Sequence, residues 1–300
     1  MAIPPPSYYQ RALGAYLGVA IGDALGATVE FMTPREIAHQ YGVHDQIRGG
    51  GWLKLKPGQV TDDTEMSLAL GRAILAEPDW NLRTVAESFA EWLRRRPPDV
   101  GNTCRRGIRR YMNDGSLESP LNPGDGGNGA CMRNVALVLS TLGNPEAFTR
   151  QTLAQAHITH NHPLSDAATL STGRMAQALI TGSSPGECLS LAHALVDEYP
   201  DFRFDPYPGR ASGYIVDTVQ TVLHFFFNTG SFEECLIGVV NRGDDADTTA
   251  AIAGMLAGAA YGFEAIPQRW LKLLDKSVRL TIETQTTALL SRSSHYSRTS

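Results

Sequence analysis

Helical spacing of apolar residues runs along nearly the whole chain and restricts its fold more than any other feature. Apolar side chains recur every three or four residues, which places them on one side of an α-helix. Alternation with a period of two, typical of a half-buried strand, is nearly absent. We therefore expect an all-α fold, with helices over residues 8–25, 64–76, 82–95, 102–113, 130–142, 145–156, 164–180, 185–199, 211–227, 231–241, 245–261 and 267–290.

We interpret residues 1–300 as one compact domain of about a dozen helices. The length alone would allow about two domains of ~150 residues, but the sequence contains no internal repeat, heptad array or low-complexity tract. Three Gly/Pro-rich stretches, 42–58, 115–129 and 200–209, interrupt the helical pattern. Loops of this length within a domain are often functional. The polar residues from about 291 onward are expected to fray.

The charge balance excludes one class of partner. The net charge is −5, and no lysine-rich stripe is present to neutralise phosphates, so we expect no nucleic-acid binding. A local cluster of arginines between residues 94 and 110 could form a basic patch, although solvated helix ends explain it more simply. Its members are Arg94, Arg95, Arg96, Arg105, Arg106, Arg109 and Arg110.

Cysteine spacing and the N-terminal sequence predict a cytoplasmic protein. The four cysteines are widely separated and form no CxxC pair, which is typical of reduced thiols. The N-terminus has neither a basic segment nor an apolar core of a signal peptide. No apolar run reaches the ~20 residues that a transmembrane helix needs.

Two acidic clusters near opposite ends of the chain predict a metal site. One is the segment TDDT (61–64) and the other is DDADTT (244–249), and each opens an apolar, Ala-rich helix. Helix capping accounts for one carboxylate per cluster, but adjacent acids repel one another unless a cation lies among them. Oxygen ligands without interleaved Cys or His favour Mg²⁺ or Mn²⁺ over Zn²⁺. We expect one or two such ions where the two helix N-termini meet.

Other candidate residues carry weaker signals. Taken alone, Asp23 and Glu30 look like surface charges. The glycine-rich loop 124–129 precedes a predicted helix, a position where backbone N–H groups can hold phosphate or ribose oxygens, although a simple turn is the default interpretation. Asp99 lies in a Pro-rich turn and would by default cap a helix. Tyr214 fits either the core or a stacking surface.

The three histidines His157, His160 and His162 invite a metal interpretation, but no Cys or second His cluster completes a zinc site. A role for one of them in acid–base chemistry or substrate contact stays open.

Taken together, several segments resemble the ADP-ribosylglycohydrolase family. No single segment is specific, but the ordered set is, and it covers about residues 10–262. The matching segments are GVAIGDALG (18–26) with Glu30, TDDT (61–64), GNGACMR (127–133), TH (159–160), SGYIVDT (212–218), RGDDADT (242–248) and AG (253–254).

The resemblance implies an all-helical fold and a dinuclear Mn²⁺ or Mg²⁺ centre. It assigns residues by match, with Glu30 and Asp62 as candidate catalytic carboxylates and Asp99 as the partner of the substrate guanidinium. Asp244 departs from the usual family pattern, and we place the second pair of acidic ligands on Asp245 and Asp247. The implied metal ligands are Thr61, Asp62, Asp63, Asp245, Asp247 and Thr248, and the implied substrate contacts are Asp99, Gly126, Gly127, Asn128, Gly129, Met132, His160 and Tyr214.

The activity implied by the resemblance is hydrolysis of the N-glycosidic bond between ADP-ribose and a protein arginine. The iron protein of nitrogenase is the implied substrate, and a PII-type signalling protein with regulated membrane association is the implied means of control. Two alternatives stay open. One is hydrolysis of O-linked or polymeric ADP-ribose, and the other is a non-catalytic ADP-ribose-binding or structural role, against which the complete set of ligand positions argues.

Overall fold

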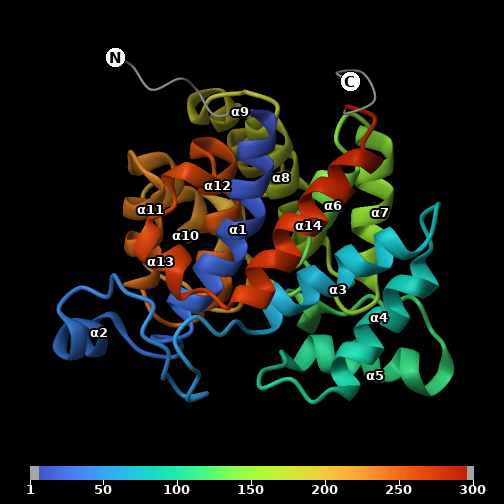
Figure 1. Ribbon diagram of the computed structural model, residues 1–300, viewed down its shortest axis with the longest axis horizontal. Helices are drawn as coiled ribbons and strands as arrows, with labels where there is room; N and C mark the ends of the chain where they lie inside the picture. Colours follow the sequence, from blue (N-terminus) through green and yellow to red (C-terminus); the bar gives the residue numbers. More distant parts are fainter. Residues whose placement is uncertain (1–6, 296–300) are drawn as a thin grey trace.

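A computed structural model describes residues 7–295, which form helices joined by loops without a β-strand among them (Figure 1). The all-α prediction is confirmed. The helices are α1 (Tyr8–Gly26), α2 (Pro34–Tyr41), α3 (Asp62–Ala76), α4 (Leu82–Arg94), α5 (Asn102–Asp114), α6 (Val135–Ser140), α7 (Pro145–His157), α8 (Pro163–Ile180), α9 (Pro185–Glu198), α10 (Ile215–Asn228), α11 (Phe232–Val240), α12 (Ala246–Tyr261), α13 (Gln268–Leu273) and α14 (Lys276–Arg292).

Three differences from the predicted helices have local causes. Helix α2 was not predicted, although Thr33 and Glu36 form a capping box and Pro34 occupies its first position. The predicted helix 130–142 is reduced to α6, because residues 128–134 form turns around the glycine-rich loop. The predicted helix 267–290 is two helices, since Asp275 accepts hydrogen bonds from the backbone N–H groups of Ser277 and Val278 and starts α14 there.

The prediction of a frayed tail from about residue 291 is wrong for residues 291–295. Helix α14 continues to Arg292, the backbone N–H of His295 donates to the carbonyl of Leu142, and the His295 ring packs against Tyr8. The rest of the predicted tail, residues 296–300, lies outside the described residues.

A ladder of small residues brings α1 and α12 into backbone contact. Glycines recur every four residues on α1, at 14, 18, 22 and 26, and each faces a backbone carbonyl of α12. A Cβ on Gly18 would overlap the Gly254 carbonyl, and a Cβ on Gly254 would overlap the Gly18 carbonyl. Both helices are buried almost throughout. Only glycine permits so close a crossing, which sets the C-terminal end of α1 beside the N-terminal end of α12.

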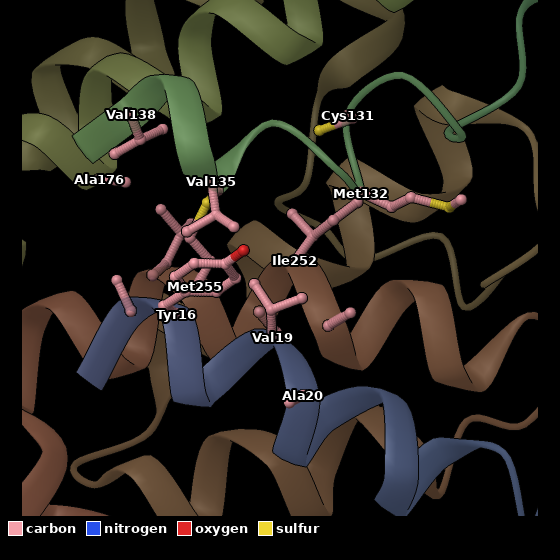
Figure 2. Close-up of a cluster of buried hydrophobic side chains, with 14 of the residues drawn as sticks. Tyr16, Val19, Ala20, Cys131, Met132, Val135, Val138, Ala176, Ile252 and Met255 are labelled. Carbon is pink, nitrogen blue, oxygen red and sulfur yellow. The ribbon is translucent and has the colours of Figure 1, made fainter. Parts of the chain in front are cut away.

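Around this pair the other helices build one core. Figure 2 shows Tyr16 and Val19 of α1 packed against Val135 of α6 and Ile252 and Met255 of α12. Inside this core, the Tyr16 hydroxyl donates to Gln285 of α14 at 2.7 Å. Helix α1 therefore contacts helices from the end of the chain, and the single domain stays a prediction.

No helix in the part of the chain that the structure describes is long and apolar enough to cross a bilayer.

Candidate active site

The N-terminus of α3 is capped by a residue from α1. Asp23 accepts hydrogen bonds from the backbone N–H of Thr61 at 3.0 Å and from that of Thr64 at 3.2 Å, and from both threonine hydroxyls. Its carboxylate is completely buried, so its interpretation as a surface charge is wrong. The sequence signal that could have found it is the glycine spacing around it, which predicts close packing. Because Asp23 caps the helix, the Thr61 side chain makes no hydrogen bond to the N-terminal backbone of α3.

Three carboxylates from two distant segments converge next to this cap. One oxygen each from Glu30, Asp245 and Asp247 lies within 4.8 Å of the other two. Glu30 is 6% exposed, so it too is not a surface charge. Asp245 accepts a hydrogen bond from the Asn128 amide, which orients it. Neither Asp245 nor Thr61 caps its own helix with its side chain, so capping does not explain these clusters.

The backbone at Asp244 decides the register of the second acidic cluster. Asp244 has a φ of 56° and an exposed side chain, and it exchanges backbone hydrogen bonds with Phe31 and Met32. This left-handed residue turns the chain so that Asp245 and Asp247 lie within the cluster with Glu30.

Asp62, Asp63 and Thr248 extend the carboxylate cluster. Asp62 accepts the backbone N–H of Gly101 at 3.1 Å. Asp63 is fully buried, and one of its oxygens, Oδ1, has no hydrogen-bond partner. Its other oxygen lies 3.2 Å from the Thr61 hydroxyl and 3.5 Å from the Thr248 hydroxyl. Buried polar atoms rarely lack a partner, so the orphaned oxygen indicates a site for a ligand.

The electrostatics of the cluster favour a bound cation. Burial, together with repulsion from nearby acids, raises the pKa of Glu30 to about 8, against the lowering effect of a hydrogen bond from Trp52. Burial, followed by repulsion from Asp99, raises the pKa of Asp62 to about 8. The pKa values of Asp63 and Asp247 are raised well above their usual range, first by burial and then by neighbouring carboxylates. A divalent cation would relieve this repulsion, and the all-oxygen donor set fits Mg²⁺ or Mn²⁺.

The cluster forms the floor of a cleft of about 600 Å³. Asp99, partly buried, lies in its wall, and burial raises the pKa of this carboxyl. The Cys104 thiol also lines the cleft, but burial raises its pKa to about 12, so it stays protonated. The predicted site residues that line the cleft are Glu30, Asp62, Asp99, Gly127, Asn128, Gly129, Met132, His160, Asp245, Asp247 and Thr248.

His160 is a buried, neutral hydrogen-bond donor in this wall. Its Nδ1 lies 2.7 Å from the Thr159 hydroxyl, which also accepts from the Arg133 guanidinium at 2.8 Å. Since this hydroxyl accepts from arginine and has one proton to donate, we expect it to donate to Nδ1, which would place the histidine proton on Nε2. Burial, together with the Arg133 charge, lowers the pKa of His160 well below its usual range. A Cβ on Gly127 would lie 3.2 Å from Nε2, so the glycine loop follows the ring closely.

Gly126 and Tyr214 lie beside the cleft and not in its wall. The ring of Tyr214, which is 43% exposed, covers the loop, since a Cβ on Gly126 would lie 3.0 Å from Tyr214 Cε2. The backbone N–H of Ile215 donates to the carbonyl of Gly126 at 2.9 Å. Their part in substrate binding stays a prediction.

Sequence reasoning missed two aromatic residues at the mouth of the cleft. The Trp52 indole N–H donates to Glu30 at 2.6 Å, and its ring lies 5.4 Å from that of Phe31. Both rings line the cleft and are more than half exposed. The only sequence signal for Trp52 was its place in the glycine-rich loop 42–58.

Comparison with known proteins agrees with this geometry. The chain is 59% identical, over 95% of its length and 97% of the relative's, to the ADP-ribosyl-[dinitrogen reductase] glycohydrolase of Rhodospirillum rubrum. It is 32% identical to the ADP-ribosylarginine hydrolase Tri1 of Serratia proteamaculans (strain 568), over 93% of this chain and 79% of that one. A solved structure described as an ADP-ribosylglycohydrolase-related protein complex superposes with a TM-score of 0.85 at 31% identity, covering 95% of this chain and 99% of that one.

The family model for ADP-ribosylglycohydrolases matches residues 4–298. The enzymatic class follows from these relatives, and the chain belongs to the ADP-ribosylglycohydrolase family.

Proposed function

We propose that this glycohydrolase releases ADP-ribose from a modified arginine on a protein, using two Mn²⁺ or Mg²⁺ ions. The observation that carries the proposal is the convergence of Glu30, Asp245 and Asp247 on the floor of a cleft whose wall contains Asp99. The R. rubrum relative is named for dinitrogen reductase, and we extend that substrate, the iron protein of nitrogenase, to this chain. Thr61, Asp62, Asp63, Asp245, Asp247 and Thr248 would hold the ions.

In this mechanism the carboxylates have different roles. The chemistry that bound divalent cations would supply is polarisation of the ribose hydroxyls and of the attacking water. Asp99 accepts two N–H bonds from the guanidinium fork and favours its departure as a cation. Glu30 or Asp62 accepts the proton of the water as general base. The transition state has oxocarbenium character, as in other glycoside hydrolyses.

The glycine loop and His160 bind the rest of the ADP-ribose in this proposal. Backbone groups at Gly127–Gly129 approach within reach of a ribose or phosphate oxygen because no side chains intervene. The neutral Nε2–H of His160 donates to such an oxygen. Tyr214, next to Gly126, offers an aromatic face to the distal end of the ligand.

The test is release of ADP-ribose from an arginine-ADP-ribosylated iron protein by metal-stripped enzyme, with and without added Mn²⁺. Asp63→Ala and Asp247→Ala are assayed beside it. Metal-dependent release that both variants lose supports the proposal. Release from serine-linked or polymeric ADP-ribose instead would move the substrate to the alternative class, and absence of both release and Mn²⁺ binding would leave a non-catalytic homologue.

Control by a PII-type signalling protein, regulated membrane association and a cytoplasmic location are supported by the family resemblance and stay predictions. Co-elution of the purified chain with a PII-type protein would test the first of these.

A further inference from the structure

Helix α5 carries an arginine face that the proposed chemistry does not use. The face consists of Arg105, Arg106, Arg109 and Arg110, which line a shallow groove of about 390 Å³ together with Asn102, Asn113 and one acid, Asp114. The segment 94–110 contains seven arginines and one acid, Asp99, in a chain of net charge −5. Seven of the 26 lysines and arginines of the chain therefore lie in this one segment.

This arrangement of arginines lowers the stability of α5. Arg105 and Arg109, like Arg106 and Arg110, are four residues apart, where like charges on a helix repel. The first turn of α5 contains no acid to offset cations near the positive end of the helix dipole. Interactions within α5 therefore do not explain the four arginines. Asp125 neutralises Arg106, and an acidic partner would neutralise the exposed Arg109.

The arginine face is rigidly mounted. On the opposite side of α5, Cys104, Gly107, Ile108 and Tyr111 are buried, and a Cβ on Gly107 would lie 2.6 Å from the Ile158 carbonyl oxygen. Arg106 pairs with the buried Asp125 and Arg110 donates to Ser119. Arg109 is exposed and makes no ion pair with any residue in the range 7–295.

The arginine face is continuous with the catalytic cleft, because Asn102 and Arg105 line both the cleft and the groove. A group bound on the outer part of the face therefore lies beside the cleft mouth, next to the point where a modified side chain enters. Nucleic acid fits this surface poorly, since the acidic remainder of the molecule would repel a long polyanion.

We infer that the arginine face of α5 docks an acidic surface of the protein that carries the ADP-ribosylated arginine. This inference rests on the proposed function and names the chemistry of its protein substrate. Complementary charge at an interface accelerates encounter and selects partners, so the face would distinguish a modified arginine in an acidic setting from one in a basic setting.

The test uses two synthetic ADP-ribosylarginine peptides of equal length, one flanked by glutamates and the other by lysines, beside free ADP-ribosylarginine. Arg109→Glu reverses one charge outside the cleft wall, and Arg109→Gln removes it. The matched control is Arg150→Glu on α7, an exposed arginine that lines neither the cleft nor the groove. We expect wild type to prefer the glutamate peptide, and Arg109→Glu to lower kcat/KM for that peptide about three- to ten-fold, mainly through KM.

Further outcomes separate this inference from the proposed function. Free ADP-ribosylarginine should be cleaved equally by wild type and Arg109→Glu, and high salt should abolish their difference on the glutamate peptide. An equal loss on free ADP-ribosylarginine would overturn the inference, because the face would then contact the ligand itself. Equal rates on both peptides, or binding of a DNA duplex that Arg109→Glu alone abolishes, would also overturn it. If wild type cleaves none of the three substrates, the proposed function fails instead.

Discussion

Asp63 is a residue that lowers the stability of the metal-free protein and is suited to bind a cation. It is fully buried between two threonine hydroxyls, and its Oδ1 lacks a partner. A carboxylate kept in such a place must be neutralised by a proton or by a cation. In the metal-free protein the raised pKa of Asp63 favours neutralisation by a proton. In the proposed metal centre a cation would neutralise it.

Asp63→Asn should therefore stabilise the metal-free protein while removing the effect of metal. Loss of the buried charge should add at least about 1 kcal/mol at pH 8, a rise in Tm of about 2–4 °C for a chain of this size. Added Mn²⁺ should raise the Tm of wild type but not that of the variant. Thermal melts in chelator and in excess Mn²⁺ measure both effects, and a lower Tm of the variant in chelator would contradict the argument.

Thr159 should fix the tautomer of His160. Thr159→Val keeps the shape but leaves Nδ1 without a donor and one Arg133 N–H without an acceptor, so we expect a loss of about 1–3 kcal/mol in stability. The ¹⁵N shifts of His160 should show an Nε2–H tautomer in wild type and in Thr159→Ser, and a mixture in Thr159→Val. KM for ADP-ribosylarginine should rise more than kcat falls. Identical ¹⁵N shifts in all three proteins would exclude this role.

At the scale of elements, the crossing of α1 and α12 positions the site. Asp23 and Glu30 come from the end of α1 and the loop after it, whereas Asp245 and Asp247 belong to the start of α12. The glycine ladder brings these four acids together, because it allows the two backbones to touch at the crossing. A small change in helix separation would therefore act on both stability and metal binding.

Gly18→Ala should separate these helices. The new Cβ would meet the Gly254 backbone, which cannot move aside as a flexible side chain would, so we expect a loss of about 3 kcal/mol in the free energy of unfolding. Mn²⁺ affinity should fall with it. Urea denaturation and Mn²⁺ titration measure the two quantities.

The matched control for Gly18→Ala is Gly186→Ala, in the first turn of α9, where a Cβ would meet only the Ser184 hydroxyl at 4.0 Å. That variant should be neutral or slightly stabilising because alanine favours helix. Similar unfolding free energies for the two variants would argue against a close crossing of α1 and α12.

At the scale of the whole molecule, the carboxylate cluster should control how stability depends on pH. Glu30 and Asp62 have pKa values raised to about 8 in the folded protein, so the folded state binds more protons than the unfolded state between about pH 4 and 8. The contribution of these two groups to metal-free stability should be fully present below this range and be lost as pH rises through it. Mn²⁺ should reverse the trend, because it binds deprotonated carboxylates.

Thermal melts between pH 5 and 8 test this prediction. At about 100 times its Kd, Mn²⁺ should raise Tm by roughly 5–10 °C at pH 8 and by less at pH 5. His157 adds a slope of the same sign, since its pKa is raised by Asp166 and its contribution is lost above that pKa. Glu30→Gln combined with Asp62→Asn retains the His157 slope and should lose the larger one. Metal-free stability that increases from pH 5 to pH 8 would refute the prediction.

The sequence by itself determined the helices and the chemical type of the site. Helical periodicity is local, so ten of the fourteen described helices correspond closely to their predicted ranges, and adjacent acids in TDDT and DDADTT indicate a hard cation wherever they lie. Three features were not predicted: the short α6, the break before α14 and the whole of α2. They depend on turns and caps, which the spacing of apolar residues indicates only weakly.

Only the tertiary structure decided which residues share the site. Burial of Asp23 and Glu30, the Trp52 contact to Glu30 and the Arg133–Thr159–His160 chain arise between segments that are distant in sequence or brought together by a loop. The family resemblance had already favoured Asp245 over Asp244, and the tertiary structure adds a physical reason, which is the pair of backbone hydrogen bonds between Asp244 and residues 31 and 32. Periodicity and capping act over a few residues, whereas burial and electrostatic repulsion depend on which distant segments meet.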